Sequence, residues 1–225
     1  MNDRPLINDL PPEYSYDENG FIKQIVRDPF IYTQDYKDHQ STNLEMSSLR
    51  LGWLAQHFTI DQMRSMEAVD VGCGNGLFVR SCEKVFRSIC GYDVVGESIS
   101  DSYLYGKVWD LSVLSDVLEH FDDIEKFFKI KWRYCMLSFP ETPPVRTFAE
   151  LQAWRHFKPN EHIYYLHAEG VKEWIRKKPS VTVIDHSNFE DLIRTRWDVN
   201  NVNISTLLLM RQIEDEGSFC NNSVP

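Results

Sequence analysis

The sequence predicts an α/β protein with a doubly wound, mostly parallel, Rossmann-like sheet, helices on both faces and an antiparallel hairpin at one edge. Three observations lead to this fold class. Short apolar runs alternate with amphipathic segments, a glycine-rich loop follows the first apolar run, and two β-branched runs close the pattern near the end of the chain. Strands that alternate with helices form a parallel sheet covered on both faces.

The first helix is expected from Met46, because Met46, Leu49, Trp53 and Leu54 fall on one helical face. EAVDV at 67–71 is then a buried strand, and apolar residues at helical spacing follow the glycines. Further strands are predicted at 88–95, 107–118 and 133–139, with helices at 122–131, 147–157 and 168–178. SVTVIDHS and NVNISTLLLMR are expected to pair as the edge hairpin.

We predict one main domain at 45–213, with a cap insertion at about 141–178 and a frayed tail at 214–225. Residues 1–44 are either a mobile leader or an aromatic cap over a pocket, in which Tyr32 and Tyr36 would take part. The odd number of cysteines, without C-x-x-C spacing, is typical of reduced thiols in a cytoplasmic protein. We expect a monomer or homodimer.

The composition disfavours two kinds of partner. The net charge of −10 would repel a polyanion such as a nucleic acid. No apolar run approaches the roughly 20 residues that a membrane span needs, so no membrane partner is expected either.

The three glycines, Gly72, Gly74 and Gly76, lie at the carboxyl end of the first strand, where open α/β sheets bind ligands. Their spacing matches neither the dinucleotide fingerprint G-x-G-x-x-G nor a phosphate loop ending in G-K-[ST]. An acidic residue, Asp70, precedes them on the strand itself. A second, Asp93, ends the next strand at about the separation expected of a carboxylate that binds ribose hydroxyls.

The stretch D-V-G-C-G-N-G resembles the glycine-rich motif of class I S-adenosylmethionine-dependent methyltransferases. The resemblance implies S-adenosylmethionine as the cofactor, with the glycine backbone packed against it, Asp70 attracting its ammonium and Asp93 binding its ribose. LSVLSDVLEHFDD at 111–123 resembles the fourth-strand motif of the branch that methylates small molecules. In that branch Ser115 and Asp116 would line the methionine moiety.

The resemblance continues through YCMLSFPETPP and HFKPNEHIYYLHAEGVKEWI, a layout similar to short methyltransferases of phages and polysaccharide gene clusters. It implies a small-molecule acceptor, such as a sugar or sugar nucleotide, methylated at oxygen or nitrogen. The sequence departs from the family after Asp93, where only 94–106 precede the next strand. The third strand is either missing or reduced to SYLYG, so no adenine contacts are assigned.

Methyl transfer is an in-line displacement, and a general base assists it when the acceptor must lose a proton. Glu119, His120, His156, His162 and His167 are the candidates, and we favour His120 and His162 as catalytic residues because their segments should border the acceptor pocket. Together with Glu161 the same side chains could bind a metal, but their spacing matches no closed zinc pattern, and no metal is assigned.

Two other functions remain open. A nucleic-acid methyltransferase would generally carry a D/N-P-P-Y/F element after the fourth strand, where this chain has S-D-V-L. A non-catalytic subunit that binds the cofactor is favoured only by the shortened region after Asp93. Arg50, on the first helix, could pair with the cofactor's carboxylate, although a surface position is the simpler expectation.

Overall fold

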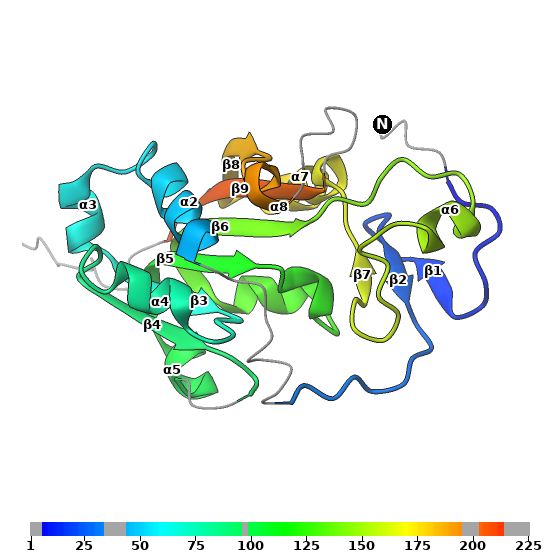
Figure 1. Cartoon of the computed structure of the whole chain (residues 1–225), viewed down its shortest axis with the longest axis horizontal. Helices are drawn as coiled ribbons and strands as arrows, with labels where there is room; N and C mark the ends of the chain where they lie inside the picture. Colours follow the sequence, from blue (N-terminus) through cyan, green and yellow to red (C-terminus); the bar gives the residue numbers. More distant parts are fainter. Residues whose placement is uncertain (1–5, 34–43, 96–98, 195–202, 214–225) are drawn as a thin grey trace, which may run out of the picture.

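The computed structural model describes residues 6–33, 44–95, 99–194 and 203–213, and it contains a six-stranded sheet and a three-stranded sheet (Figure 1). The order in the large sheet is β4-β3-β5-β6-β9-β8. Its strands are Glu67–Val71 (β3), Ser88–Tyr92 (β4), Val108–Ser115 (β5), Lys131–Pro140 (β6), Val181–Ser187 (β8) and Ile204–Arg211 (β9). β3 to β6 are parallel, whereas β9 is antiparallel to both β6 and β8. The predicted fold class, including the edge hairpin, is confirmed.

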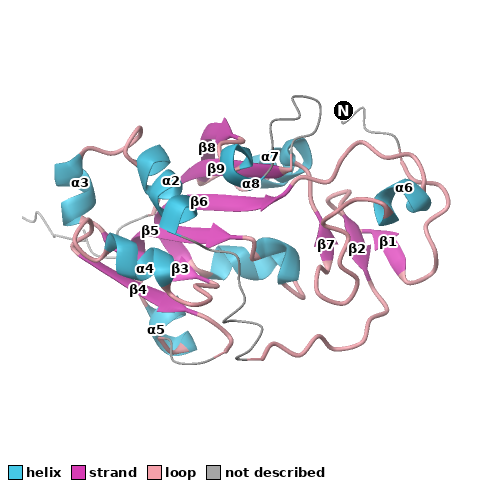
Figure 2. Ribbon diagram, in the orientation of Figure 1, coloured by secondary structure: helices cyan, strands magenta, loops and turns pink. Residues whose placement is uncertain are grey.

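Helices cover both faces of this sheet (Figure 2). The first core cluster includes side chains from Asp101–Gly106 (α5), the 3₁₀ helix Ile124–Lys129 (η2) and Ala168–Arg176 (α7). The second includes side chains from Leu44–Leu54 (α2), Ile60–Ser65 (α3) and Leu77–Cys82 (α4). Because side chains alternate along a strand, Leu137 of β6 packs in the first cluster and Met136 in the second.

The small sheet forms a cap at one end of the molecule, on the right in Figure 1. Tyr14–Tyr16 (β1) pairs with Ile22–Gln24 (β2), which pairs with Tyr164–Tyr165 (β7), all antiparallel. A separate core of Ile7, Tyr14, Ile22, Leu151 and Tyr165 lies beneath it, reached also by Phe148–Gln152 (α6). The cap therefore combines the N-terminal segment with α6 and β7 from the predicted insertion at about 141–178, whereas α7 from the same range packs on the large sheet. The predicted domain boundaries remain predictions, and the tail at 214–225 and Tyr36 lie outside the described residues.

The region after Asp93 contains α5 in place of a third strand. No strand lies between β4 and β5 in the part of the chain that is described, so β4 is the edge of the sheet. Of the two alternatives that the sequence left open, a missing third strand is therefore the one observed, and SYLYG is helical, with Ser100 as the cap that accepts a hydrogen bond from the Tyr103 N–H at 3.3 Å. The predicted helix at 122–131 is the shorter η2, and that at 147–157 is confined to α6.

Candidate active site

The glycine-rich loop joins β3 to α4 and has left-handed backbone at all three predicted glycines. The φ angles are 72° at Gly72, 53° at Gly74 and 71° at Gly76, values that residues with a side chain rarely adopt. A Cβ on Gly72 would also lie 2.2 Å from Cγ2 of Val117. Glycine thus lets this loop turn sharply and pass close to the segment that follows β5.

Asp93 follows β4 and fixes the conformation of the glycine loop. Its Oδ2 accepts a hydrogen bond from the Gly74 N–H at 2.8 Å, and its Oδ1 accepts one from the Val95 N–H at 3.0 Å. The Gly72 N–H donates to the carbonyl of Tyr92 at 2.7 Å. Each carboxylate oxygen can accept more than one hydrogen bond, so Asp93 keeps the capacity to bind a ligand hydroxyl as well.

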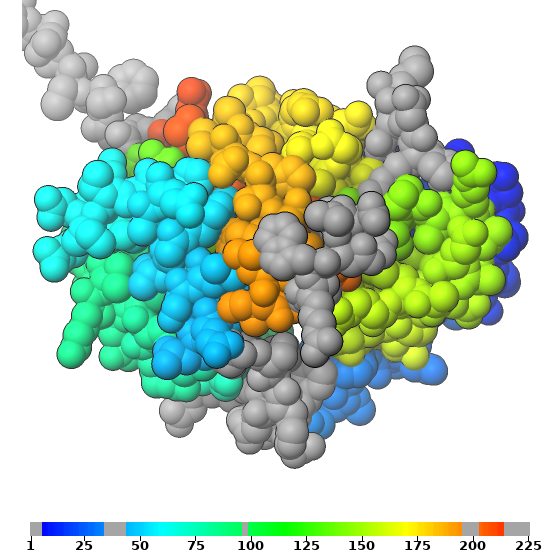
Figure 3. Space-filling view, turned by 45° about the horizontal axis from the view of Figure 1, so that its top comes forward, coloured from blue at the N-terminus to red at the C-terminus, as the bar shows by residue number. Residues whose placement is uncertain are grey.

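A cavity of about 300 Å³ opens beside this loop, within the range of roughly 300–1,000 Å³ typical of small-molecule sites. It is lined by Gly72, Gly74, residues 92–95, Asp116, Val117, residues 120–122, and Arg27, Tyr32 and Thr33 of the N-terminal segment. The glycine loop, the carboxylate after β4 and the segment after β5 therefore border one space. Figure 3 shows the outside of the molecule, with the orange segment that carries Asp191–Arg194 (α8) between α2 and the yellow-green part of the cap.

Asp70 lies on β3 and is only 6% exposed. Burial, opposed by the Arg50 guanidinium and assisted by the negative charge of Asp93, raises its pKa to about 7. Asp70 therefore changes its charge near neutral pH, unlike an ordinary aspartate. A ligand cation close to it would favour the ionised form.

Ser115 ends β5, and Asp116 follows it and lines the cavity. Asp116 has φ of 56° and forms an ion pair with Arg194 of α8. Burial alone would raise the pKa of Asp116, but the charges of Arg194 and Arg50 lower it. Within the described residues, the other oxygen of Asp116, Oδ1, and Oγ of Ser115 are buried without a hydrogen-bond partner.

Glu119, His120 and His162 form a compact cluster next to the cavity. Glu119 and His120 belong to the 3₁₀ helix Leu118–His120 (η1), and the His120 and His162 ring centroids are 4.8 Å apart. Nε2 of His120 lies 3.7 Å from Oε1 of Glu119. Burial raises the pKa of Glu119 well above its usual value, and the Asp116 charge raises it further. Burial also lowers the pKa of both histidines, so their imidazoles are neutral at pH 7.

His156 and His167 are not part of this cluster, whereas Glu161 borders it, with its carbonyl 2.9 Å from His120 Nδ1 and its Oε1 4.0 Å from His162 Nε2. His167 caps α7, since its Nδ1 accepts a hydrogen bond from the Gly170 N–H at 3.0 Å. Glu161 pairs with Lys158 at 3.0 Å. His156 is partly buried, and burial lowers its pKa to about 4. The structure thus separates His120 and His162 from the two other histidines with which the sequence grouped them.

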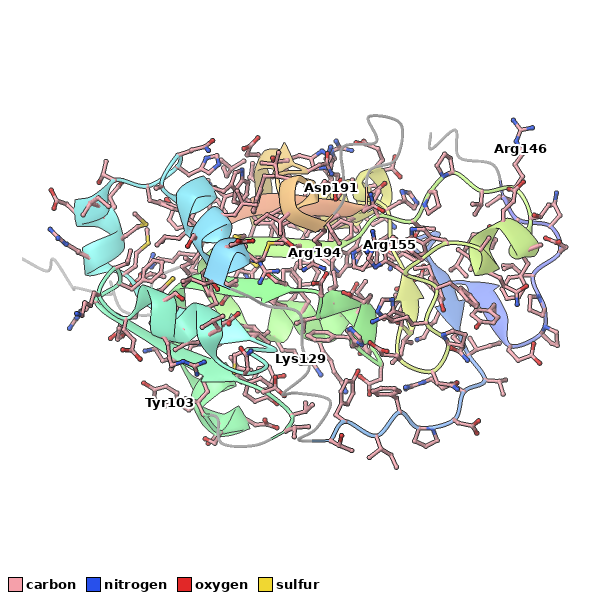
Figure 4. The ribbon with its side chains drawn as sticks, viewed as in Figure 1. Tyr103, Lys129, Arg146, Arg155, Asp191 and Arg194 are labelled. Atoms are coloured by element: carbon pink, nitrogen blue, oxygen red, sulfur yellow. The ribbon has the colours of Figure 1, made fainter. Side chains whose placement is uncertain are left out.

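The sequence suggested a surface position for Arg50. The structure instead buries Arg50 and gives it a partner within the chain. It is 4% exposed, and its Nε and Nη2 donate to the two oxygens of Glu190 at 2.8 and 3.1 Å. Arg194 also pairs with Glu190, at 3.0 Å, four residues away on the chain. Figure 4 shows Arg194 near the centre of the molecule, close to Arg155. Sequence reasoning missed Glu190 and Arg194, although their i,i+4 spacing was a readable signal.

The parallel part of the sheet has a glycine loop after its first strand and a carboxylate after its second. This arrangement is typical of α/β proteins that bind a nucleotide-like ligand. The methyltransferase domain family matches residues 49–178, more than half of the chain, so the protein belongs to that family. No curated protein matches the sequence. None of the helices in the described residues is long and apolar enough to cross a membrane.

Solved structures share the fold at low sequence identity. The small RNA methyltransferase HEN1 is 15% identical with a TM-score of 0.52, over 86% of this chain and 28% of that one. Magnesium protoporphyrin IX methyltransferase ChlM from Synechocystis PCC 6803, with bound SAH, is 13% identical with a TM-score of 0.50, over 77% and 90%. The plantazolicin methyltransferase BpumL is 8% identical with a TM-score of 0.51, over 80% and 89%.

The predicted family and enzyme class are confirmed: the chain is a class I S-adenosylmethionine-dependent methyltransferase. The family and the fold also support S-adenosylmethionine as its cofactor. The individual site residues stay predictions, and so does the acceptor.

Proposed function

We propose that this methyltransferase transfers the methyl group of S-adenosylmethionine to an oxygen or nitrogen atom of a small molecule, such as a sugar or sugar nucleotide. One observation carries the proposal: a single cavity is bordered by the glycine loop and Asp93 and also by His120. Groups suited to the cofactor and a group suited to the acceptor therefore face the same space.

The residues present fit the cofactor. A Cβ at Gly72 would clash with Val117, so only glycine fits at this position. Gly72 and Gly74 have no side chains, so they line the cavity with backbone atoms alone. Asp93 would accept hydrogen bonds from the ribose, and Asp70 would attract the ammonium, directly or through water. The unsatisfied atoms Ser115 Oγ and Asp116 Oδ1 would bind the polar groups of the methionine moiety.

The bound cofactor supplies a methyl group on a sulfonium, which is already a good leaving group. The chain has to hold the acceptor about 3 Å from that methyl and in line with the breaking bond. Arg27, Tyr32 and Thr33 of the N-terminal segment would exclude water from the site. The neutral imidazoles of His120 and His162 would assist the loss of the acceptor proton, because only a neutral imidazole can accept a proton or bind a cation.

A small acceptor agrees better with this chain than a nucleic acid does. The net charge is −10, and Arg50 and Arg194 are held in internal ion pairs. Related folds act on acceptors as different as small RNA and magnesium protoporphyrin IX, so the fold alone does not select the acceptor. Cys82, Cys90 and Cys135 are free thiols, which agrees with the cytoplasmic setting that we propose. We also propose that the protein is a monomer or a homodimer.

Calorimetric titration with S-adenosylmethionine and S-adenosylhomocysteine tests the cofactor site. Both ligands should bind the wild type, and binding should be lost in Gly74→Arg and weakened in Asp93→Ala. Gly52→Arg is the matched control, because Gly52 is exposed on α2 with nothing within 4 Å of a Cβ. Absence of binding to folded wild-type protein would favour a non-catalytic role. Methylation of RNA, but not of sugar nucleotides, by the active enzyme would refute the small-molecule assignment.

A further inference from the structure

The carboxylate of Glu119 is buried without a partner. Its residue is 1% exposed, and neither Oε1 nor Oε2 has a hydrogen-bond partner within the described part of the chain. An ionised carboxylate in such a position is strongly unfavourable unless a cation compensates it. We propose that Glu119, His120 and His162 together bind a divalent metal ion, a site that the sequence spacing did not assign.

The orientation of His120 is that of a metal ligand. Its Nδ1 lies 2.9 Å from the backbone carbonyl of Glu161 and 2.9 Å from the Tyr32 hydroxyl. A carbonyl oxygen can only accept, so Nδ1 carries the proton and Nε2 presents its lone pair. That lone pair is on the nitrogen that lies 3.7 Å from Glu119 Oε1. Metal-bound histidines characteristically donate their other ring N–H to a backbone carbonyl or a carboxylate in this way.

His162 completes the set from the other side. It is 4% exposed, and its ring meets that of His120 edge to face, at an angle of 87°. One ligand atom from each of the three residues lies within 4.8 Å of the others. Bonds of about 2.0–2.2 Å to a cation require a somewhat closer set, which side-chain rotations of about 1 Å would give. The Ile163 N–H donates to the Glu119 carbonyl at 2.8 Å, so the two segments are already joined.

The ligand types and nearby charges indicate which cation fits. Two imidazole nitrogens and one carboxylate oxygen suit Zn²⁺, Mn²⁺, Co²⁺ or Fe²⁺ better than Ca²⁺, and three protein ligands leave positions open for another molecule. The nearest cationic side chains do not repel an ion unopposed, because Arg194 pairs with Asp116 and Glu190, and Lys158 pairs with Glu161.

The role of the metal rests on the proposed function. His120 lines the cavity where the acceptor would bind, so a cation on its Nε2 would lie at the inner side of that space. A metal ion there would hold an acceptor oxygen and lower the pKa of a hydroxyl. With the metal bound, His120 and His162 would act as its ligands and not as bases. The class of acceptor is then one that offers a hydroxyl or carboxylate oxygen to a metal.

The test uses full-length, tag-free protein freed of metal by a chelator and titrated separately with Zn²⁺, Mn²⁺ and Co²⁺, without cofactor or acceptor. We expect one equivalent of Zn²⁺ or Co²⁺ per chain by calorimetry, and visible absorption bands for bound Co²⁺. Glu119→Gln, which keeps the size of the side chain, and His162→Gln should each weaken binding by about tenfold or more. His186→Gln, on β8 at the sheet edge, is the histidine control and should bind like the wild type.

Failure of the metal site and failure of the proposed function are distinguishable. No stoichiometric binding of any of the three ions, or equal binding by wild type and Glu119→Gln, would overturn the metal site. Titration of the same preparations with S-adenosylhomocysteine reports on the cofactor site separately. Both variants must show cooperative thermal unfolding, so that loss of metal binding is not loss of the fold. If Glu119→Gln unfolds, His162→Gln decides.

Discussion

The raised pKa of Asp70 predicts that cofactor binding depends on pH. Asp70 is buried on β3, and its pKa is about 7, so only part of the protein has this carboxylate ionised at neutral pH. If the ammonium of the ligand keeps Asp70 ionised in the complex, binding releases the proton. Affinity must then fall as pH falls through 7, because the free protein has to give up that proton first.

The size of the effect follows from the ionised fraction. With a pKa of about 7, roughly one tenth of Asp70 is ionised at pH 6 and about three quarters at pH 7.5, so the affinity for S-adenosylhomocysteine should change about eightfold. Calorimetry at pH 6.0, 6.5, 7.0 and 7.5, in two buffers of different ionisation enthalpy, measures affinity and proton release together. About half a proton should be released per ligand at pH 7.

Asp70→Asn distinguishes this carboxylate from other titrating groups. The variant should bind more weakly than the wild type at pH 7.5, and its affinity should be nearly constant from pH 6 to 7.5. Asp110→Asn, on β5, is the control and should keep the wild-type pH profile. A flat profile in the wild type, or the same slope in Asp70→Asn, would show that Asp70 does not interact with the ligand's ammonium.

The same group affects stability in the absence of ligand. Because the folded state raises the pKa of Asp70 from 3.8 to about 7, the folded protein binds the proton more tightly than the unfolded chain. Its contribution to the free energy of unfolding is greatest below about pH 4 and is lost as pH rises to 7, on the order of 4 kcal/mol in total. Asp70→Asn should remove this dependence, so urea unfolding at pH 7.5 should find the unliganded variant more stable than the wild type.

Three further substitutions test other parts of the structure. Gly72→Ala should abolish binding of S-adenosylhomocysteine, because a Cβ cannot be placed in the loop, whereas Gly52→Ala in helix α2 should bind normally and gain about 0.5–1 kcal/mol in urea unfolding. Glu190→Leu should lower the free energy of unfolding by about 3–5 kcal/mol, since it leaves the Arg50 charge buried and unpaired; a change below 1 kcal/mol would contradict this. Leu151→Ala should lower it by about 2–5 kcal/mol if the cap unfolds with the main sheet, and a separate transition would show that the cap unfolds independently.

The parts of the site that the sequence could predict are those in which local backbone geometry sets the residue type. Gly72, Gly74 and Gly76 all have positive φ, which only glycine adopts readily. The position of Asp93 follows equally directly, because parallel strands bring their carboxyl ends together at one edge of the sheet.

Contacts between distant segments could not be predicted in this way. The Arg50–Glu190 pair joins residues 140 positions apart, and no periodic pattern reports such a pair. The wider set of possible metal ligands shows the same limit, although the favoured pair, His120 and His162, does lie together. His167 is close to His162 in sequence, but it caps α7, whereas His120, 42 positions away on the chain, contacts His162. Where the third strand was expected, Ser100 caps α5, and this cap was the local signal for a helix in the sequence.

A chain of ion pairs beside the end of β5 explains how the site can hold its shape before any ligand binds. Asp116 has a left-handed backbone, which is strained for a residue with a side chain and persists only where its surroundings impose it. Arg194 provides that constraint, because it pairs with both Asp116 and Glu190, and Glu190 is held in turn by Arg50 of α2. The chain of ion pairs links α2, α8 and the end of β5. These charges satisfy one another within the chain, whereas within the described residues Asp116 Oδ1 and Ser115 Oγ have no hydrogen-bond partner.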